Sequence, residues 1–221
     1  MSILTFLLTR HSIVNPFALV WHRFRNLLGS KTFLLVLDID GTIWPNTGPG
    51  SFFRPFKIYR IWETQFTYNP FENCLVFVTN QSSFARSNHI KYRSIFYFYL
   101  RVYYLMMLTG ATAVYFCNHH PDATYKGLRT SCQFRKPSSK MIQRAIKSLD
   151  QDPRKAILVG DRITDVIAGA SAGLLNTVLI YNDEMFLENI NGDIGNSEFA
   201  FFEVAKLKDI ESYFSHRFHY G

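Results

Sequence analysis

The sequence is poor in cysteine and has no long uninterrupted apolar run. Only three cysteines occur among 221 residues. A dense, even-numbered cysteine set marks small secreted disulfide scaffolds, so that class is excluded and a reducing, cytoplasmic location is expected. A membrane-spanning helix needs about 18 or more apolar residues in a row, and no stretch approaches this length. The chain therefore has the features of a globular protein without membrane spans.

Acidic residues are missing from two long stretches. None precedes Asp38, none lies between Glu72 and Asp122, and the formal net charge is +7. A positive surface favours anionic partners, which include phosphate esters, nucleic acids and acidic lipids. Charge alone does not separate these partners. A small phosphorylated molecule is the partner class we expect, and nucleic acid is the weaker alternative.

Residues 1–30 differ from the rest of the chain and are predicted to form a basic, partly amphipathic N-terminal extension. They combine apolar residues with arginines, and a secretory signal fits poorly because no basic n-region or small-residue cleavage site is present. Three alternatives stay open: a transit peptide, a membrane-surface helix, and an extension that packs on the domain. Residues 31–221 are predicted to form one domain, and the protein is expected to be a monomer.

From Phe33 onward, short apolar runs alternate with helical patterns. The predicted strands cover 33–37, 74–78, 113–116, 156–159, 177–180 and 199–202. The predicted helices cover 54–66, 86–108, a segment starting near Ser138, 164–173 and 206–214. Continuous apolar strands that alternate with helices indicate a mostly parallel sheet covered on both faces. The fold class is therefore α/β.

Polar residues follow or close several of these strands. Asp38 and Asp40 follow the first strand, Thr79 ends the second, and Asp161 follows the fourth, with Asp165 close behind. The carboxyl ends of parallel strands line the ligand crevice of an open α/β sheet. Lys136 precedes the helix that leads into the fourth strand. We therefore expect all of these side chains to converge at one edge of the sheet.

Each of these residue types suits phosphoryl transfer. Asp38 could attack phosphorus to form an aspartyl-phosphate, and Asp40 could act as general acid and then general base. Asp38 and Asp161, with a backbone carbonyl of Ile39 or Asp40, could bind Mg²⁺. Lys136 and the Thr79 hydroxyl would neutralise and orient phosphoryl oxygens. The alternative, that the acids only cap helices and turns, does not account for their joint placement.

The four clusters resemble the motifs of the haloacid dehalogenase-like (HAD) phosphatases. They occur in the family's order: Asp38-Ile-Asp-Gly-Thr42, Thr79-Asn-Gln, Lys136, and Gly160-Asp161 with Asp165. The resemblance implies a Rossmann-like three-layer α/β sandwich and a magnesium-dependent phosphatase. It makes Asp38 the nucleophile, Asp40 the general acid and base, Asp161 a metal ligand and Asp165 a supporting carboxylate.

Three further segments resemble one branch of that family, the histidinol-phosphate and D-glycero-D-manno-heptose 1,7-bisphosphate phosphatases. They are 78–86 and the pair 117–121 and 132–137. The branch has no large cap domain, and it implies substrate contacts from Thr79, Asn80, Lys136 and the preceding Arg135. The expected substrate is a sugar phosphate such as the heptose bisphosphate. Arg86 and Arg129 are weaker candidates for a second phosphate.

Four alternatives to a sugar phosphatase remain. Histidinol phosphate and a polynucleotide 3′-phosphate are possible substrates of the same chemistry. The aromatic and basic helix predicted at 86–108 could be a platform for nucleic acid, although aromatic residues at helical spacing are more often core. A non-catalytic phosphate-binding protein of the same fold would be expected to have lost a catalytic carboxylate, and here all are present.

One feature departs from the branch. Its zinc loop has the pattern Cys-x-His followed by Cys-x-Cys, and this chain supplies Cys117, His119 and Cys132 but has Phe134 at the last position. A structural zinc normally takes four nitrogen or sulfur ligands. With three ligands in the loop and an aromatic ring in place of the fourth, zinc binding is expected to be weak or absent.

Overall fold

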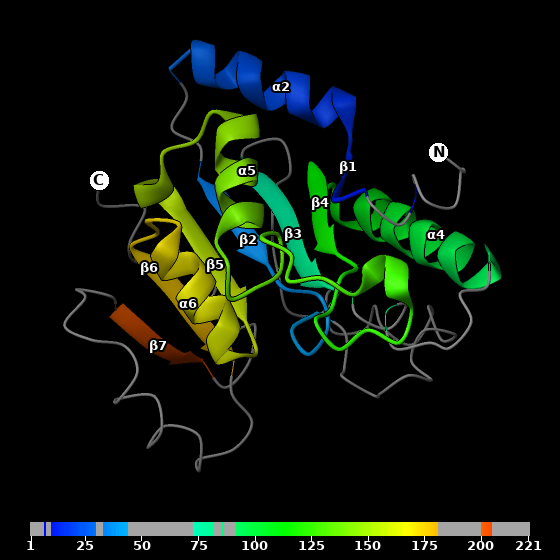
Figure 1. Ribbon diagram of the computed structural model, residues 1–221. Coiled ribbons are helices and arrows are strands. Elements are labelled where there is room, and N and C mark those ends of the chain that lie inside the picture. Colours follow the sequence, from blue (N-terminus) through cyan, green and yellow to red (C-terminus); the bar gives the residue numbers. More distant parts are fainter. Residues whose placement is uncertain are drawn as a thin grey trace.

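The computed structural model describes residues 7, 10–29, 33–43, 73–81, 85, 92–180 and 200–204 (Figure 1). Its strands are β1 (Ser12–Val14), β2 (Leu34–Leu37), β3 (Cys74–Asn80), β4 (Ala113–Cys117), β5 (Ala156–Gly160), β6 (Asn176–Ile180) and β7 (Ala200–Val204). Its helices are α2 (Pro16–Leu27), α4 (Tyr92–Thr109), α5 (Lys140–Leu149) and α6 (Ile163–Ser171), with 3₁₀ turns η3 (Lys126–Leu128) and η4 (Pro153–Lys155).

The strands form one sheet in the order β1-β4-β3-β2-β5-β6-β7. All neighbouring strands run parallel except β1, which pairs antiparallel with β4 at the edge. Strand β2 lies at the centre, with Val36 opposite Val76 of β3 on one side and Leu158 of β5 on the other. The mostly parallel sheet predicted from the sequence is confirmed.

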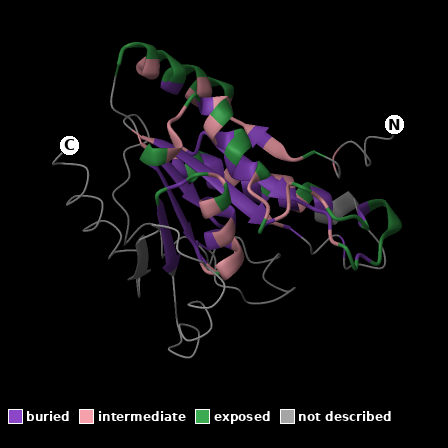
Figure 2. Ribbon diagram, turned by 60° about the vertical axis from the view of Figure 1, so that its left-hand side comes forward, coloured by how far each residue is buried: buried purple, intermediate pink, exposed green. Residues whose placement is uncertain are grey.

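Helices cover both faces of the sheet, which makes three layers. Alternate side chains of a strand point to opposite faces, so Leu35 and Leu37 pack with α4 through residues such as Phe98 and Val102. Leu34 and Val36 belong to the core on the other face, where α5 and α6 pack. Figure 2 shows the central strands buried along their length between these layers. Burial on both faces explains why the strands are continuous apolar runs.

The helix α5 shows how the sequence builds a layer. Its buried residues are Met141, Ile142, Ala145 and Leu149, a spacing that places them on one face of a helix. The helix ends at Asp150, whose left-handed backbone conformation (φ 53°) stops further helical hydrogen bonding. The strand β5 follows after the turn η4, so α5 is the crossover connection between β4 and β5.

The N-terminal segment is partly built into the domain. Ser12–Val14 forms the edge strand β1, and the Asn15 side chain caps α2 by accepting from the amides of Phe17 and Ala18. Helix α2 lies against the end of α5, where Arg23 donates two hydrogen bonds to the Ser148 carbonyl. Strand β1 was not predicted, whereas a helix and an extension that packs on the domain were among the alternatives left open for residues 1–30. No helix in the described ranges is long and apolar enough to cross a membrane.

The predicted core strands match β2 to β7, with boundaries that differ by at most a few residues. The helix predicted at 86–108 is observed as α4, from Tyr92 to Thr109, and part of the predicted span lies outside the described residues. The helices predicted at 54–66 and 206–214 also lie outside them. Within the described ranges all named strands belong to the one sheet, and no cap domain is present there.

Candidate active site

The carboxyl ends of β2, β3 and β5 bring the predicted catalytic residues together. Asp38 follows β2 directly and is held in line by its amide, which donates to the Val159 carbonyl of β5 at 2.9 Å. Thr79 is the last buried residue of β3, and Asp161 follows the last residue of β5. These positions are those of the crevice that parallel α/β sheets form at a strand end.

Lys136 lies at the centre of this group. Its ammonium contacts a carboxylate oxygen of Asp38 at 2.5 Å and one of Asp165 at 2.5 Å, and it donates to the Val78 carbonyl at 2.9 Å. All three charged side chains are almost completely buried. A buried ammonium this close to two carboxylates is held rigidly, because any displacement leaves a charge without a partner.

The β3 residues fix the surroundings of Lys136 and Asp40. Asn80 forms a reciprocal pair of 3.0 Å hydrogen bonds with the backbone of Lys136, so the loop that carries the lysine is tied to the strand. Gln81 donates to the Asp40 carboxylate at 2.5 Å and to the Thr79 hydroxyl at 2.9 Å. No role was predicted for Gln81 from the sequence. Its position two residues after Thr79, on the same side of an extended chain, was the available signal.

Two glycines allow the carboxylates to approach this closely. Gly41 has a φ of +96°, and a Cβ there would lie 1.8 Å from a carboxylate oxygen of Asp161. A Cβ on Gly160 would lie 2.5 Å from the Cβ of Asp165. The carboxylate of Asp165 also accepts from the Arg162 amide, which orders the start of α6. The site therefore needs glycine at both positions for steric reasons.

The site holds more negative than positive charge. Burial raises the pKa of Asp38 well above its ordinary value although Lys136 opposes the rise, and burial together with Asp165 raises the pKa of Asp161. Burial disfavours the charged form of Lys136, but the Asp38 and Asp165 carboxylates outweigh it and raise its pKa. One ammonium thus does not compensate the surrounding carboxylates, and a bound cation would lower their pKa values again.

The donor set fits a hard divalent cation. One carboxylate oxygen from each of Asp38, Asp161 and Asp165 lies within 4.8 Å of the others. The Oδ1 atom of Asp161 is buried and has no hydrogen-bond partner among the described residues. A buried carboxylate oxygen that lacks a partner is costly, and a cation is the natural partner for it. Oxygen ligands of this kind are those that Mg²⁺ prefers.

The remaining predicted residues fall into two groups. Arg135 lies beside the site and donates to the His119 carbonyl at 3.1 Å. Arg129 is exposed and donates to the Ala123 carbonyl, and Arg86 lies outside the described residues. Cys117, the last residue of β4, comes together with His119 and Cys132 of the loop that follows, and His11 joins them from the N-terminal segment. The position of His11 beside these three residues was not predicted from the sequence.

The chain is similar to known proteins along most of its described length. A family model described as HAD-hydrolase-like matches residues 133–185. A D-glycero-beta-D-manno-heptose-1,7-bisphosphate 7-phosphatase of Haemophilus ducreyi is 34% identical over 48% of this chain, a match that spans 59% of that protein. A relative of the same name from Photorhabdus laumondii is 30% identical over 65% of this chain and 78% of that protein.

The fold is also similar to that of a solved structure, the D,D-heptose 1.7-bisphosphate phosphatase from B. bronchiseptica complexed with magnesium and phosphate. The two share 20% sequence identity with a TM-score of 0.58, over 84% of this chain and 99% of that one. At this identity the similarity establishes the fold only. The chain spans less than two thirds of the H. ducreyi relative and more than three quarters of the P. laumondii one.

Proposed function

Because the chain belongs to the HAD-like family, in the branch that includes the heptose bisphosphate phosphatases, we propose that it is a phosphomonoester hydrolase. The observation that carries this proposal is the buried cluster in which Lys136 contacts Asp38 and Asp165 beside Asp161. Burying a cluster of charged side chains has an unfavourable desolvation free energy. A catalytic role explains best why such a cluster lies at the crevice.

The reaction follows from the two carboxylates after β2. A carboxylate oxygen of Asp38 attacks phosphorus, and the bond from phosphorus to the ester oxygen breaks. Asp40, half-buried and held by Gln81, gives its proton to the departing alkoxide. Asp40 then takes a proton from a water molecule, whose oxygen attacks phosphorus. Inorganic phosphate leaves, and the Asp38 carboxylate is restored.

The cationic and hydroxyl groups position the phosphoryl group during both steps. The Thr79 hydroxyl accepts from Gln81, so its own proton can be donated to a phosphoryl oxygen. The Lys136 ammonium lies against the nucleophile and opposes the negative charge of the incoming ester. The backbone ties between Asn80 and Lys136 keep both groups at fixed positions.

We propose that Mg²⁺ is the cofactor, because the donor set suits it and the B. bronchiseptica structure contains magnesium with phosphate. Asp38 and Asp161 would hold the ion with a backbone carbonyl of Asp40, and Asp165 would support them. When bound, the ion would offset the carboxylate charge and polarise the phosphoryl oxygens.

The substrate we propose is a compact sugar phosphate such as D-glycero-D-manno-heptose 1,7-bisphosphate. The relatives of known name act on this compound. The net charge of +7 favours a doubly anionic molecule, and Arg135 supplies a guanidinium close to Lys136 in the chain. The cytosol is the proposed compartment, because the three cysteines are free thiols.

The test is release of inorganic phosphate by the purified full chain from sugar bisphosphates, histidinol phosphate, nucleotides and 3′-phosphorylated DNA, with Asp38→Asn as the matched control. We expect the highest kcat/KM for sugar bisphosphates and almost no turnover by Asp38→Asn. A preference for 3′-phosphorylated DNA would overturn the substrate assignment, and no phosphate release from any ester by the wild-type protein would overturn the enzymatic function.

A membrane-surface contact through α2 is a further part of the proposal. The face of α2 opposite α5, together with Leu28 directly after the helix, exposes a row of apolar side chains that also contains Phe17, Val20, Phe24 and Leu27. Arginines flank this row, and no acidic residue precedes Asp38, so an anionic lipid surface complements it. Cosedimentation with anionic vesicles should fall in a Phe24→Ser, Leu27→Ser variant; equal cosedimentation of variant and wild type would refute the contact.

A further inference from the structure

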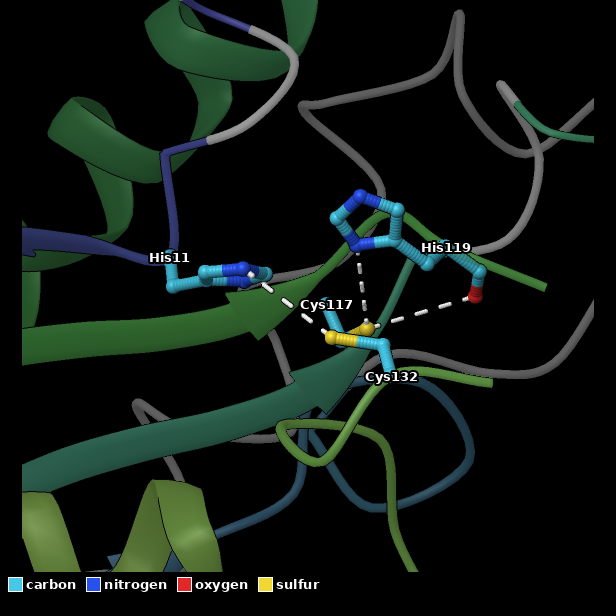
Figure 3. A group of neighbouring side chains, drawn as sticks. All are labelled: His11, Cys117, His119 and Cys132. Carbon is cyan, nitrogen blue, oxygen red and sulfur yellow. Dashed lines mark hydrogen bonds between the residues drawn. The ribbon is translucent and has the colours of Figure 1, made fainter. Parts of the chain in front are cut away.

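Four potential metal ligands meet beside the carboxyl end of β4. They are His11, Cys117, His119 and Cys132, and their ligand atoms all lie within 4.8 Å of one another (Figure 3). The Cys117 sulfur is 3.8 Å from Nδ1 of His119, and the Cys132 sulfur is 4.0 Å from Nε2 of His11. Tetrahedral zinc with its usual bond lengths places such ligand atoms about 3.3–3.8 Å apart, so only a small contraction is needed.

We propose that this group binds one zinc ion, with His11 as the fourth ligand in place of the cysteine that position 134 lacks. The resemblance to known phosphatases supplies only the three ligands of the loop. His11 comes from the N-terminal segment, more than a hundred residues earlier in the sequence. The expectation of weak zinc binding was based on three ligands, and the fourth removes its basis. The inference does not depend on the proposed catalytic function.

The edge strand β1 brings His11 to the loop. Ser12 pairs with Tyr115 of β4, and the Phe116 amide donates to the His11 carbonyl at 2.9 Å, so the pairing continues one residue beyond β1. In this register the His11 side chain lies next to the end of β4, where Cys117 is the last residue. In Figure 3 the imidazole of His11 points from the β1 side toward the sulfur of Cys132.

A backbone carbonyl sets the tautomer of His11. Its Nδ1 atom lies 3.1 Å from the Phe116 carbonyl oxygen, and this oxygen can only accept, so Nδ1 carries the proton. The lone pair is then on Nε2, the atom that faces Cys132. Histidines that bind metals nearly always donate their other ring nitrogen to a carbonyl or carboxylate in this way. Unlike the mere proximity of the four residues, this orientation points specifically to a ligand role.

Phe134 supports the arrangement and does not obstruct it. Its ring stacks on the imidazole of His11 with centroids 4.4 Å apart and an interplanar angle of 9°, and the Arg144 guanidinium lies 5.6 Å from its centroid. The aromatic ring therefore lies beside the fourth ligand and fixes the plane of His11. Loss of the cysteine at 134 and recruitment of His11 are structurally compatible.

A site with four protein ligands is closed and structural, without an open position for water. Here it would fasten the N-terminal strand to the loop after β4. That loop carries His119, whose carbonyl accepts from Arg135. The zinc would thus connect β1 to the segment that places Arg135 and Lys136, and removal of zinc should loosen both ends of this connection.

Elemental analysis and cobalt spectroscopy of the full chain, purified without chelators, test the proposal. We expect close to one zinc per chain, and in the Co²⁺ form the intense visible bands of a four-coordinate site with thiolate ligands. His11→Ala should weaken zinc binding by about 100-fold or more, since even outer-shell changes cost about 10–100-fold. His120→Ala is the matched control and should bind like wild type, because the His120 ring instead accepts from the Asp122 amide.

A second pair of variants separates loss of the ligand from misfolding. His11→Cys should retain zinc, and adding Phe134→Cys to His11→Ala should restore it, because each supplies a fourth ligand near the same point. Wild-type zinc affinity in His11→Ala would overturn the proposal. So would a metal-free wild-type protein that also fails to bind added Co²⁺, or one in which Cys117 and Cys132 form a disulfide under reducing purification.

Discussion

At the scale of single residues, the site depends on a few groups that have no substitutes. Among the described residues, Lys136 is the only lysine whose ammonium contacts the carboxylates of this site, and Asp38 and Asp165 both face it at 2.5 Å. Only glycine fits at position 41, because the Asp161 carboxylate occupies the space that a Cβ atom would need. Substitutions at these two positions therefore test separate parts of the site, its electrostatics and its steric fit.

Lys136→Met should lower kcat by about 10²–10³-fold, the usual cost of losing a preorganised group that stabilises developing charge. The methionine keeps the aliphatic bulk, but the buried carboxylates of Asp38 and Asp165 lose their shared partner, so the melting temperature should also fall. Phosphate release measured well below the melting temperature checks the prediction. Lys140→Met, an exposed lysine at the start of α5, is the control and should be neutral. Equal kcat for both variants would contradict it.

Gly41→Ala should lower kcat strongly and raise the Mg²⁺ requirement, and Gly29→Ala should change neither. Both glycines have positive φ, +96° and +72°, so alanine strains the backbone at each by roughly 1–2 kcal/mol. Only at Gly41 does the added Cβ meet another group, the Asp161 carboxylate, whereas nothing lies within 4 Å at Gly29. Melting temperatures and the Mg²⁺ concentration for half-maximal rate separate the two effects. A Gly41→Ala enzyme with an unchanged Mg²⁺ requirement would argue against Asp161 as a ligand.

At the scale of elements, the sequence predicts those whose burial is uniform. The strands β2 to β5 are largely apolar along their length, and α5 has a clear apolar face, so pattern alone locates them. Strand β1 has only three residues and lies at the edge of the sheet, so it is too short to show an alternation of apolar and polar residues. The bounds of helix α2 were not predicted, because most of its large apolar side chains face outward, which obscures the usual signal of a core helix.

The packing of α2 should be sensitive to acid through His22. This side chain is buried, neither ring nitrogen has a hydrogen-bond partner among the described residues, and burial together with Arg25 lowers its pKa to about 4. The folded pKa lies below the ordinary value of 6.5, so the folded state binds this proton less readily than the unfolded state. The contribution of the buried, neutral His22 side chain to the stability of the folded state is therefore fully present above pH 6.5. It is lost as the pH falls toward about 4.

Melting temperatures of the wild type and His22→Leu between these pH values check this prediction. Leucine removes the titrating group and fills the buried position with an apolar side chain. The variant should therefore lose less stability than the wild type as the pH falls. Other groups titrate in the same range, but they are common to both proteins and cancel in the difference. Parallel pH profiles would show that the His22 side chain does not control the packing of α2.

At the scale of the whole molecule, topology explains why the convergence of Asp38, Thr79 and Asp161 could be predicted and the approach of His11 to the β4 loop could not. The carboxyl ends of parallel strands meet at one edge of the sheet. Asp38, Thr79 and Asp161 are therefore expected close together once the strands that precede them are taken to be parallel. His11 reaches Cys132 only because an unpredicted edge strand pairs with β4. Likewise, the contact of Gln81 with Asp40 depends on side-chain geometry, which no periodic pattern encodes.

The central claim, that Asp38 is a covalent nucleophile, is tested most directly by trapping the intermediate. The enzyme is quenched during turnover of a sugar bisphosphate, the acyl-phosphate is reduced with borohydride, and the peptides are sequenced by mass spectrometry. We expect homoserine at position 38 in the wild type and no homoserine in Asp38→Asn or in enzyme quenched without substrate. Rapid turnover with no homoserine at position 38, or with homoserine at a different aspartate, would contradict the mechanism.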